Sequence, residues 1–129
     1  MAARSKPVFT NEAPRPIGPY SQAIVCGEFV FCSGQLGLDP FTGELAGKSA
    51  AEQAERALLN LRAVLNTAGS ELSHVVKVTL YLKNMKDFDE VNHAYAKHFI
   101  DGKPARSTVG VSDLPKNALV EIDAIAEVR

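Results

Sequence analysis

The stretch ALVEIDAIAEV, residues 118–128, alternates between two kinds of side chain. Every second residue from Ala118 to Val128 is alanine, valine or isoleucine, whereas the positions between them combine Leu119 and Ile125 with three acids. Successive side chains of a strand point to opposite faces of a sheet, so the alternation predicts a strand with one face in the core. The second face is too apolar for open solvent and too acidic for a core.

The segment HVVKVTLYLK, residues 74–83, predicts a second half-buried strand by the same alternation. Its buried face is expected to hold Val76, Val78, Leu80 and Leu82, and its other face Lys77, Thr79, Tyr81 and Lys83. Thr79 and Tyr81 extend the mixed face of the last strand. A single chain that exposed such a face would risk associating with itself. We therefore expect an oligomer, with ionisable groups at the interfaces between copies.

Two helices are predicted between the strands. Ser49 followed by Glu52 is a capping-box pattern, apolar residues recur at helical spacing over residues 54–68, and Gly69 supplies the end. Residues 88–100 form the second predicted helix, with an apolar stripe of Phe88, Val91, Tyr95 and Phe99.

The remaining segments complete the order β-β-α-β-α-β-β. Residues 22–34 are expected to form a hairpin with its turn at Gly27–Glu28, and residues 106–111 a short strand. Residues 1–20 are expected to be irregular because they contain four prolines. The order predicts an α+β fold with both helices on one face of a mixed sheet.

Length and composition indicate one globular domain over residues 1–129, of which 1–7 are expected to be flexible. Hydrophobic residues make up 46% of the chain and charged residues 22%. The net charge of −1 gives no basic surplus for nucleic-acid binding. No apolar run reaches the roughly 18 residues of a membrane span, and no secretory signal precedes the domain. The expected location is cytoplasmic, with a short mitochondrial presequence containing Arg4 and Lys6 as the alternative.

The two cysteines are expected to be free thiols. A two-residue hairpin loop would place Cys26 opposite Phe29 and Cys32 opposite Ala23, so the thiols would not be cross-strand neighbours. Free thiols suit a reducing compartment. The histidines and cysteines lack the spacing of metal ligands, so no metal site is predicted.

The segment GKPARSTVG, residues 102–110, sets one arginine among small residues at the start of a strand. Arg106 needs an anionic partner, and two readings stay open. One is a structural salt bridge to an internal acid such as Glu121, or a merely solvated charge. The other is a site for a small anionic substrate, in which the guanidinium binds a carboxylate through two hydrogen bonds.

In the second reading Glu121 would transfer a proton or bind a water molecule, and partial burial would raise its pKa. Ser33, Gly34 and Thr108 would add hydroxyl and backbone donors. Tyr20 is read either as ordinary packing or as a pocket wall, and Asn92 either as a surface residue or as a hydrogen-bonding residue at an interface.

Several motifs together resemble one known family. They are IGPYSQA, VFCSGQLGLDPFTGEL, NLRAVLNTAGS, VVKVTLYLKNMKDFDEVNHAYAKHF, PARSTVGV and LPKNALVEIDAIAEVR. In order and spacing they are similar to the RidA/YjgF/YER057c/UK114 family of reactive-intermediate deaminases, from about residue 8 to residue 129. The resemblance implies a chorismate-mutase-like α+β fold with a six-stranded mixed sheet. It also implies a homotrimer around a central barrel, with three sites in the clefts between subunits.

The activity implied by the resemblance is hydrolysis of the enamines and imines that pyridoxal-phosphate-dependent dehydratases release. The substrates would be 2-iminobutanoate and 2-iminopropanoate, the products 2-oxo acids and ammonia, and no cofactor would be bound. Two alternatives stay open. One is a non-catalytic regulatory or chaperone-like trimer that binds 2-oxo or imino acids, and the other is an endoribonuclease or translation inhibitor.

The resemblance also implies roles for individual residues. Arg106 matches the arginine that binds the substrate carboxylate, and Glu121 the glutamate that positions water and relays a proton. The pocket lining implied by the resemblance consists of Tyr20, Ser33, Gly34, Asn92 and Thr108.

Two positions depart from the family pattern. Thr108 stands where many members have cysteine, which removes any thiol-based redox control there. Gly110 stands where larger residues are common, which is expected to widen the pocket or loosen the strand.

Overall fold

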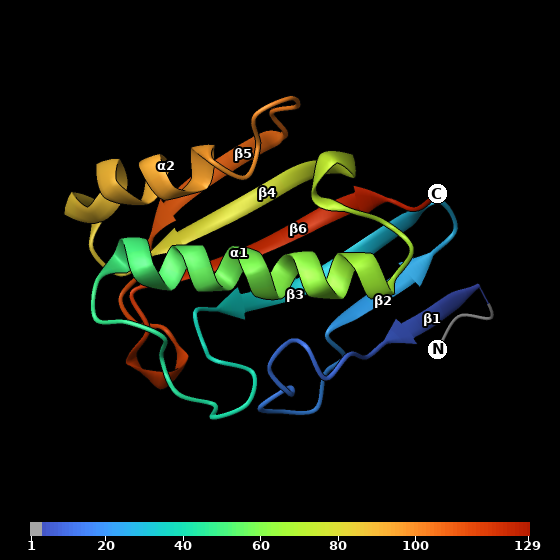
Figure 1. Ribbon diagram of the computed structural model, residues 1–129, viewed down its shortest axis with the longest axis horizontal. Helices are drawn as coiled ribbons and strands as arrows, with labels where there is room; N and C mark the ends of the chain where they lie inside the picture. The colour runs from blue at the N-terminus through green and yellow to red at the C-terminus, as the bar shows by residue number, and fades with distance from the viewer. Residues whose placement is uncertain (1–3) are drawn as a thin grey trace.

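The computed structural model describes residues 4–129, and within them six strands and two α-helices follow in the order β-β-β-α-β-α-β-β (Figure 1). The strands are β1 (Ser5–Val8), β2 (Ala23–Cys26), β3 (Phe29–Leu36), β4 (Val75–Leu82), β5 (Ala105–Gly110) and β6 (Val120–Glu127). The α-helices are α1 (Ala50–Thr67) and α2 (Phe88–Ala96), and short 3-10 turns occupy Leu72–His74, Met85–Asp87 and Pro115–Asn117. No helix in this part of the chain is both long and apolar enough to cross a membrane.

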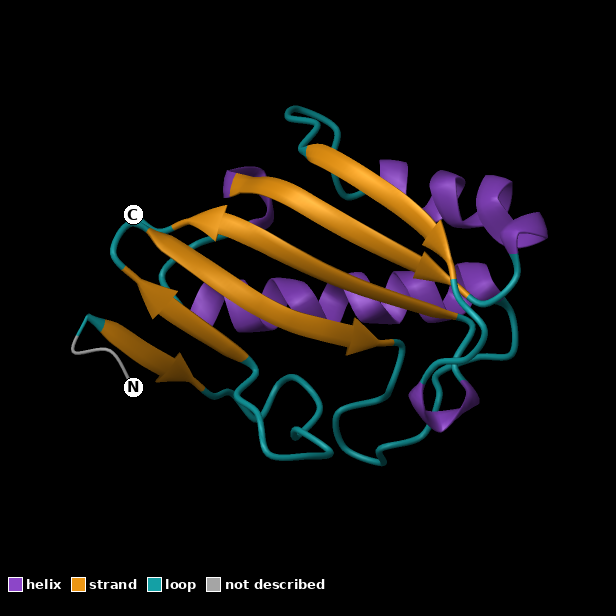
Figure 2. Ribbon diagram, turned by 180° about the vertical axis from the view of Figure 1, so that it is seen from behind, coloured by secondary structure: helices purple, strands orange, loops and turns teal. Residues whose placement is uncertain are grey.

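The strands form one mixed sheet in the order β1-β2-β3-β6-β4-β5. β4 and β5 run parallel, and every other neighbouring pair is antiparallel. Both helices cover the same face, and the opposite face carries no helix (Figures 1 and 2). The α+β architecture with two helices on one face is therefore confirmed.

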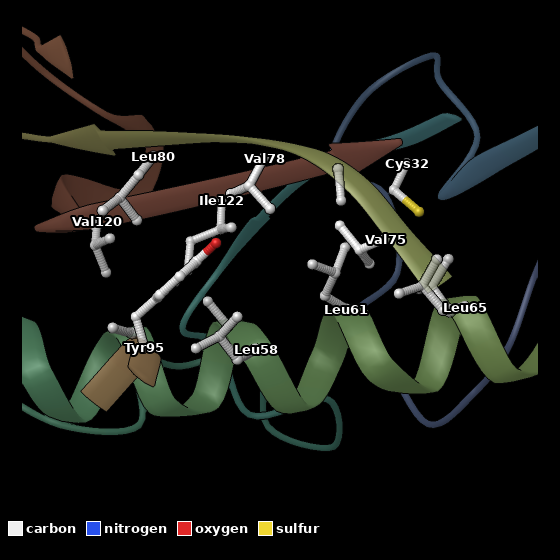
Figure 3. Packing of buried hydrophobic residues seen from close by; sticks show 14 of the residues in the cluster. Cys32, Leu58, Leu61, Leu65, Val75, Val78, Leu80, Tyr95, Val120 and Ile122 are labelled. Carbon is white, nitrogen blue, oxygen red and sulfur yellow. The ribbon is translucent and has the colours of Figure 1, made fainter. Parts of the chain in front are cut away.

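A layer of aliphatic side chains fills the space between the sheet and the helices (Figure 3). The predicted face of β6 contributes to it, since Val120, Ile122, Ala124 and Ala126 are all buried. The helical spacing of α1 also holds, and its largest contributions are Leu58, Leu61 and Leu65. α2 ends at Ala96 rather than at residue 100, yet Phe99 still packs into the same layer.

The prediction for β4 is wrong at one residue. Val76 is 40% exposed, whereas Val75 is 7% exposed and takes the inward position. The pairing of β4 with β6 shifts register between Val75 and Lys77, as in a β-bulge, so the alternation restarts after the shift. From Val78 onward the predicted inward residues are all buried.

The prediction of irregular structure over residues 1–20 is wrong for Ser5–Val8. These residues form β1, which pairs antiparallel with β2. Pro7 is tolerated because β1 lies at the edge of the sheet, where one side of the strand needs no ladder hydrogen bonds. The predicted flexible start also covers residues 1–3, which lie outside the described residues.

The local signals for α1 and for the hairpin are confirmed. The Ser49 side chain accepts a hydrogen bond from the Glu52 amide at 3.1 Å, the Glu52 side chain accepts one from the Ser49 amide, and Gly69 follows the helix with φ +86°. In the hairpin, Cys26 pairs with Phe29 and Ala23 with Cys32. Both cysteines are free, and burial raises the pKa of Cys32 to about 12, which keeps it a neutral thiol.

The register shift in β4 predicts an asymmetry between two adjacent valines. Val75→Ala should lower the free energy of unfolding by about 1–2 kcal/mol more than Val76→Ala, because only Val75 gives up buried methyl groups. Urea unfolding with an unchanged m-value would measure the difference. Equal losses would contradict the observed register.

Candidate functional site

Arg106 lies on the edge strand of the sheet and faces the helices. Among the described strands β5 pairs with β4 alone, and Arg106 stands opposite Val78, whose side chain is buried beneath the helices. Thr108 stands opposite Leu80, which is buried on the same face. Both side chains therefore belong to the helix-covered side of the edge strand.

Side chains of α2 hold the guanidinium of Arg106. Nη2 of Arg106 donates a hydrogen bond to Oδ1 of Asn92 at 2.7 Å. The guanidinium carbon lies 4.7 Å from the ring centroid of Tyr95 and 5.7 Å from that of Phe88, within the range of cation–π attraction. Within residues 4–129 no carboxylate forms an ion pair with Arg106. The salt-bridge reading with Glu121 is therefore not found within one chain.

A groove of about 730 Å³ opens beside Arg106. Its walls are mainly apolar, with Tyr95, Phe99 and Ile100 among them, and its charged lining besides Arg106 is Lys103 and Asp89. A small carboxylate with an apolar side chain fits this combination of charge and lining.

Glu121 lies on the uncovered face of the sheet. It stands opposite Tyr81 on β4 and packs directly against Gly34 of β3, where any Cβ would overlap its carboxylate. Burial raises the pKa of Glu121, and the negative charge of Asp123 raises it further. The Asp123 carboxylate accepts a hydrogen bond from the Tyr81 hydroxyl at 3.0 Å.

Tyr20 and Ser33 lie near Gly34 of β3, a strand that β6 and β4 separate from β5 in the sheet. The Ser33 hydroxyl donates to the Ser21 carbonyl at 2.6 Å, which ties β3 to the segment that carries Tyr20. Tyr20 and Gly34 together line a small cavity of about 20 Å³. Gln22 fixes the loop before them, since it accepts from the Thr10 amide at 2.7 Å and donates to the Pro14 carbonyl at 2.9 Å.

The candidate residues thus fall into two groups that one chain does not bring together. Arg106, Asn92 and Thr108 form the first group at the β5–α2 edge. The second group consists of Glu121, Gly34, Ser33 and Tyr20. β4 separates β5 from β6, and Arg106 and Glu121 face opposite sides of the sheet, so Arg106 and Glu121 do not lie on neighbouring strands.

The sequence interpretation missed one role. Tyr95 and Phe88 were predicted only as members of an apolar stripe, yet both rings also face the guanidinium of Arg106. Their spacing around Asn92, together with the arginine on the following strand, is the signal that the sequence offered. At Gly110, Met85 occupies the space that a side chain would fill, and Gly110 still pairs with Leu82.

The family model described as Endoribonuclease L-PSP matches residues 10–128. The chain belongs to this family. The resemblance to the RidA/YjgF group is thereby confirmed, since relatives of the chain carry reactive-intermediate-deaminase names.

Individual relatives match nearly the whole chain. A RutC family protein of Pyrococcus abyssi is 50% identical over 119 residues, covering 92% of this chain and 94% of the relative. A protein of Dermatophagoides farinae named 2-iminobutanoate/2-iminopropanoate deaminase is 43% identical over 122 residues, covering 95% of each chain. The crystal structure of a putative endoribonuclease from Thermotoga maritima is similar with a TM-score of 0.92 and 48% identity, covering 96% of this chain and 98% of that one.

Because Gly34 packs against Glu121, even a methyl group at position 34 should destabilise this L-PSP family member. Gly34→Ala should lower the free energy of unfolding by about 1–3 kcal/mol, because the methyl group must displace the carboxylate. Gly102→Ala is the matched control, since no atom lies within 4 Å of its Cβ position, and it should cause no loss. In a Glu121→Ala background the loss from Gly34→Ala should shrink. Chemical denaturation of the unmodified protein and the four variants measures this, and an unchanged loss would exclude the contact.

The charge of Asp123 should be visible in the titration of Glu121. Asp123→Asn removes a neighbouring negative charge that disfavours ionisation, so the pKa of Glu121 should fall toward its ordinary value. NMR titration of 13C-labelled glutamate side chains measures the shift. Asp113→Asn, at an exposed residue paired with Lys83, should leave the pKa of Glu121 unchanged. An unmoved Glu121 in Asp123→Asn would contradict the electrostatic coupling.

Proposed function

We propose that this protein hydrolyses reactive enamine and imine intermediates, 2-iminobutanoate and 2-iminopropanoate, to 2-oxo acids and ammonia. The observation that carries the proposal is an arginine anchored on α2 beside an apolar groove, with no acid of its own chain paired to it in residues 4–129. The name of the Dermatophagoides farinae relative supports the same activity.

The hydrogen-bonding capacity of Arg106 supports an anionic substrate. A guanidinium has five N–H donors, and one of them is used by Asn92. A carboxylate can accept two parallel hydrogen bonds from the remaining donors, which fixes both the position and the orientation of a small imino acid.

Imine hydrolysis requires mainly that the substrate and water are oriented and that protons are transferred. The imine carbon is electrophilic, so water adds to it, a C–O bond forms, and the nitrogen takes up a proton. The amino group of the resulting carbinolamine takes up a second proton, its C–N bond breaks and ammonia leaves, and the hydroxyl gives up the proton that balances this transfer as the 2-oxo acid forms. Glu121, whose pKa burial raises above its ordinary value, is suited to accept and return these protons.

The separation of the two residue groups supports an active site built between copies. The β5–α2 edge of one protomer supplies Arg106, and the uncovered face of another supplies Glu121. Exposed aromatic rings on that face, Phe29 and Phe31, favour its burial in a homotrimer whose sheets surround a central barrel. Three equivalent sites would follow. Pyridoxal-phosphate-dependent dehydratases would supply the substrate, and the protein itself would need no cofactor.

A coupled assay tests the activity. Threonine dehydratase converts threonine to the imine, semicarbazide traps what is not hydrolysed, and added protein should reduce semicarbazone and increase free 2-oxobutanoate. Arg106→Ala should lower kcat/KM about 100-fold or more, because the substrate carboxylate loses its charge partner. Arg62→Ala, at an exposed residue of α1, should match the unmodified protein. Hydrolysis that survives in Arg106→Ala would remove the residue from the site, and carboxylate binding without turnover would favour the non-catalytic trimer.

Mixed oligomers test whether two copies build one site. Arg106→Ala and Glu121→Gln proteins, each inactive alone, should regain about one quarter of the normal activity when refolded together in equal amounts. Random mixing restores an intact Arg106 and an intact Glu121 at about one site in four if neighbouring subunits supply them. No recovery in mixed oligomers of normal size would place both groups in the same chain.

A further inference from the structure

Three side chains of α2 reach Arg106 from one face of the helix. Phe88, Asn92 and Tyr95 are spaced four and three residues apart, which places them on one stripe of an α-helix. α2 connects the parallel strands β4 and β5 and lies beside them (Figure 1), and the contacts of the stripe with Arg106 place it over the edge strand.

We propose that Tyr95 is a positioning residue that sets the plane of the Arg106 guanidinium for carboxylate binding, while Asn92 fixes one edge of it. The inference rests on the proposed function, in which that carboxylate belongs to an imino acid. It gives Tyr95 a role beyond packing, and it makes Asn92 a partner of Arg106 rather than of the substrate.

The ring of Tyr95 is held firmly enough to act as a platform. Tyr95 is 8% exposed and packs against Phe99, with ring centroids 4.6 Å apart. Its centroid is 4.7 Å from the guanidinium carbon, whereas the less buried Phe88 is at 5.7 Å. Cation–π attraction strengthens as water is excluded, so Tyr95 contributes more than Phe88.

The proposal assigns this role to the ring of Tyr95 and not to its hydroxyl. It is buried and has no hydrogen-bond partner among the described residues, and its oxygen points toward the sheet (Figure 3). Burial raises the pKa of Tyr95, although the charge of Arg106 and the closeness of its N–H groups to the phenol oxygen oppose the shift, so the phenol stays neutral. The role is assigned to the ring face, so a phenylalanine should serve equally well.

The two contacts involve different parts of the guanidinium, one its edge and the other its face. Asn92 accepts the hydrogen of Nη2, and the Tyr95 ring covers a face that forms no hydrogen bonds. The donors that remain lie in the guanidinium plane, whose orientation the ring restricts. Loss of the ring should therefore weaken carboxylate capture more than it slows the chemical step.

Three variants separate positioning from packing. Tyr95→Leu removes the ring, Tyr95→Phe removes only the hydroxyl, and Val91→Ala truncates a buried residue of α2 that offers the guanidinium of Arg106 neither a hydrogen-bond acceptor nor an aromatic ring. In the imine assay Tyr95→Leu should raise KM about tenfold with kcat changed less than about threefold. Tyr95→Phe should keep the normal KM. Val91→Ala should lower Tm and also keep the normal KM.

Each alternative result overturns the inference. A normal KM in Tyr95→Leu would exclude the ring as a platform. A Tyr95→Phe protein as impaired as Tyr95→Leu would assign the effect to the hydroxyl. An equal rise of KM in Val91→Ala would show that any loosening of α2 has the same effect.

A second readout does not depend on imine hydrolysis. Phenylglyoxal reacts with accessible guanidinium groups, and peptide mass spectrometry gives the rate at Arg106, with the exposed Arg62 as internal reference. The rate at Arg106 should rise several-fold in Tyr95→Leu and stay normal in Tyr95→Phe. Equal rates in all proteins would overturn the positioning role. A protein without imine hydrolysis that still shows the rate difference would refute the proposed function alone.

Discussion

Burial of one face of the sheet against α1 and α2 is the interaction on which the rest of the structure depends. The inward residues of β4 and β6 and the leucines of α1 share a single apolar layer. Because both helices lie on that side, no helix among residues 4–129 covers the other face. The same asymmetry that forms the core therefore leaves Glu121 and its neighbours on a surface that only another molecule can enclose.

The covered side also determines how Arg106 is prepared for a ligand. A charged side chain at the edge of an apolar layer needs compensation, and α2 supplies it through an amide oxygen and two aromatic rings rather than through an acid. Glu121, on the opposite face, cannot neutralise the arginine of its own chain. Neither group neutralises the other within one chain, so in the proposed function the isolated chain is an incomplete form of the catalyst.

Local patterns in the sequence were sufficient to predict those elements whose structure depends on residues close together in the chain. The alternation of β6, the capping box of Ser49 and the two-residue hairpin all predicted what is observed. The misplaced Val76 arises from pairing with β6, and β1 forms because β2 offers an edge, so neither could be read from its own segment. The same holds for the site, because the position of β4 between Arg106 and Glu121 is a property of strand order alone.

The position of β6 has a consequence for how the chain folds as it leaves the ribosome. β6 is the last strand along the chain, yet it lies between β3 and β4. Until β6 is synthesised, β1–β3 and β4–β5 are separate pieces. The edges of β3 and β4 that β6 will join are both open, and α1 has no complete surface to pack on. Folding must therefore finish after nearly all of the domain has emerged, through contacts between distant segments, which is a slow class of event. A nascent chain interrupted before Val120 would present both open edges to the folding machinery of the cell.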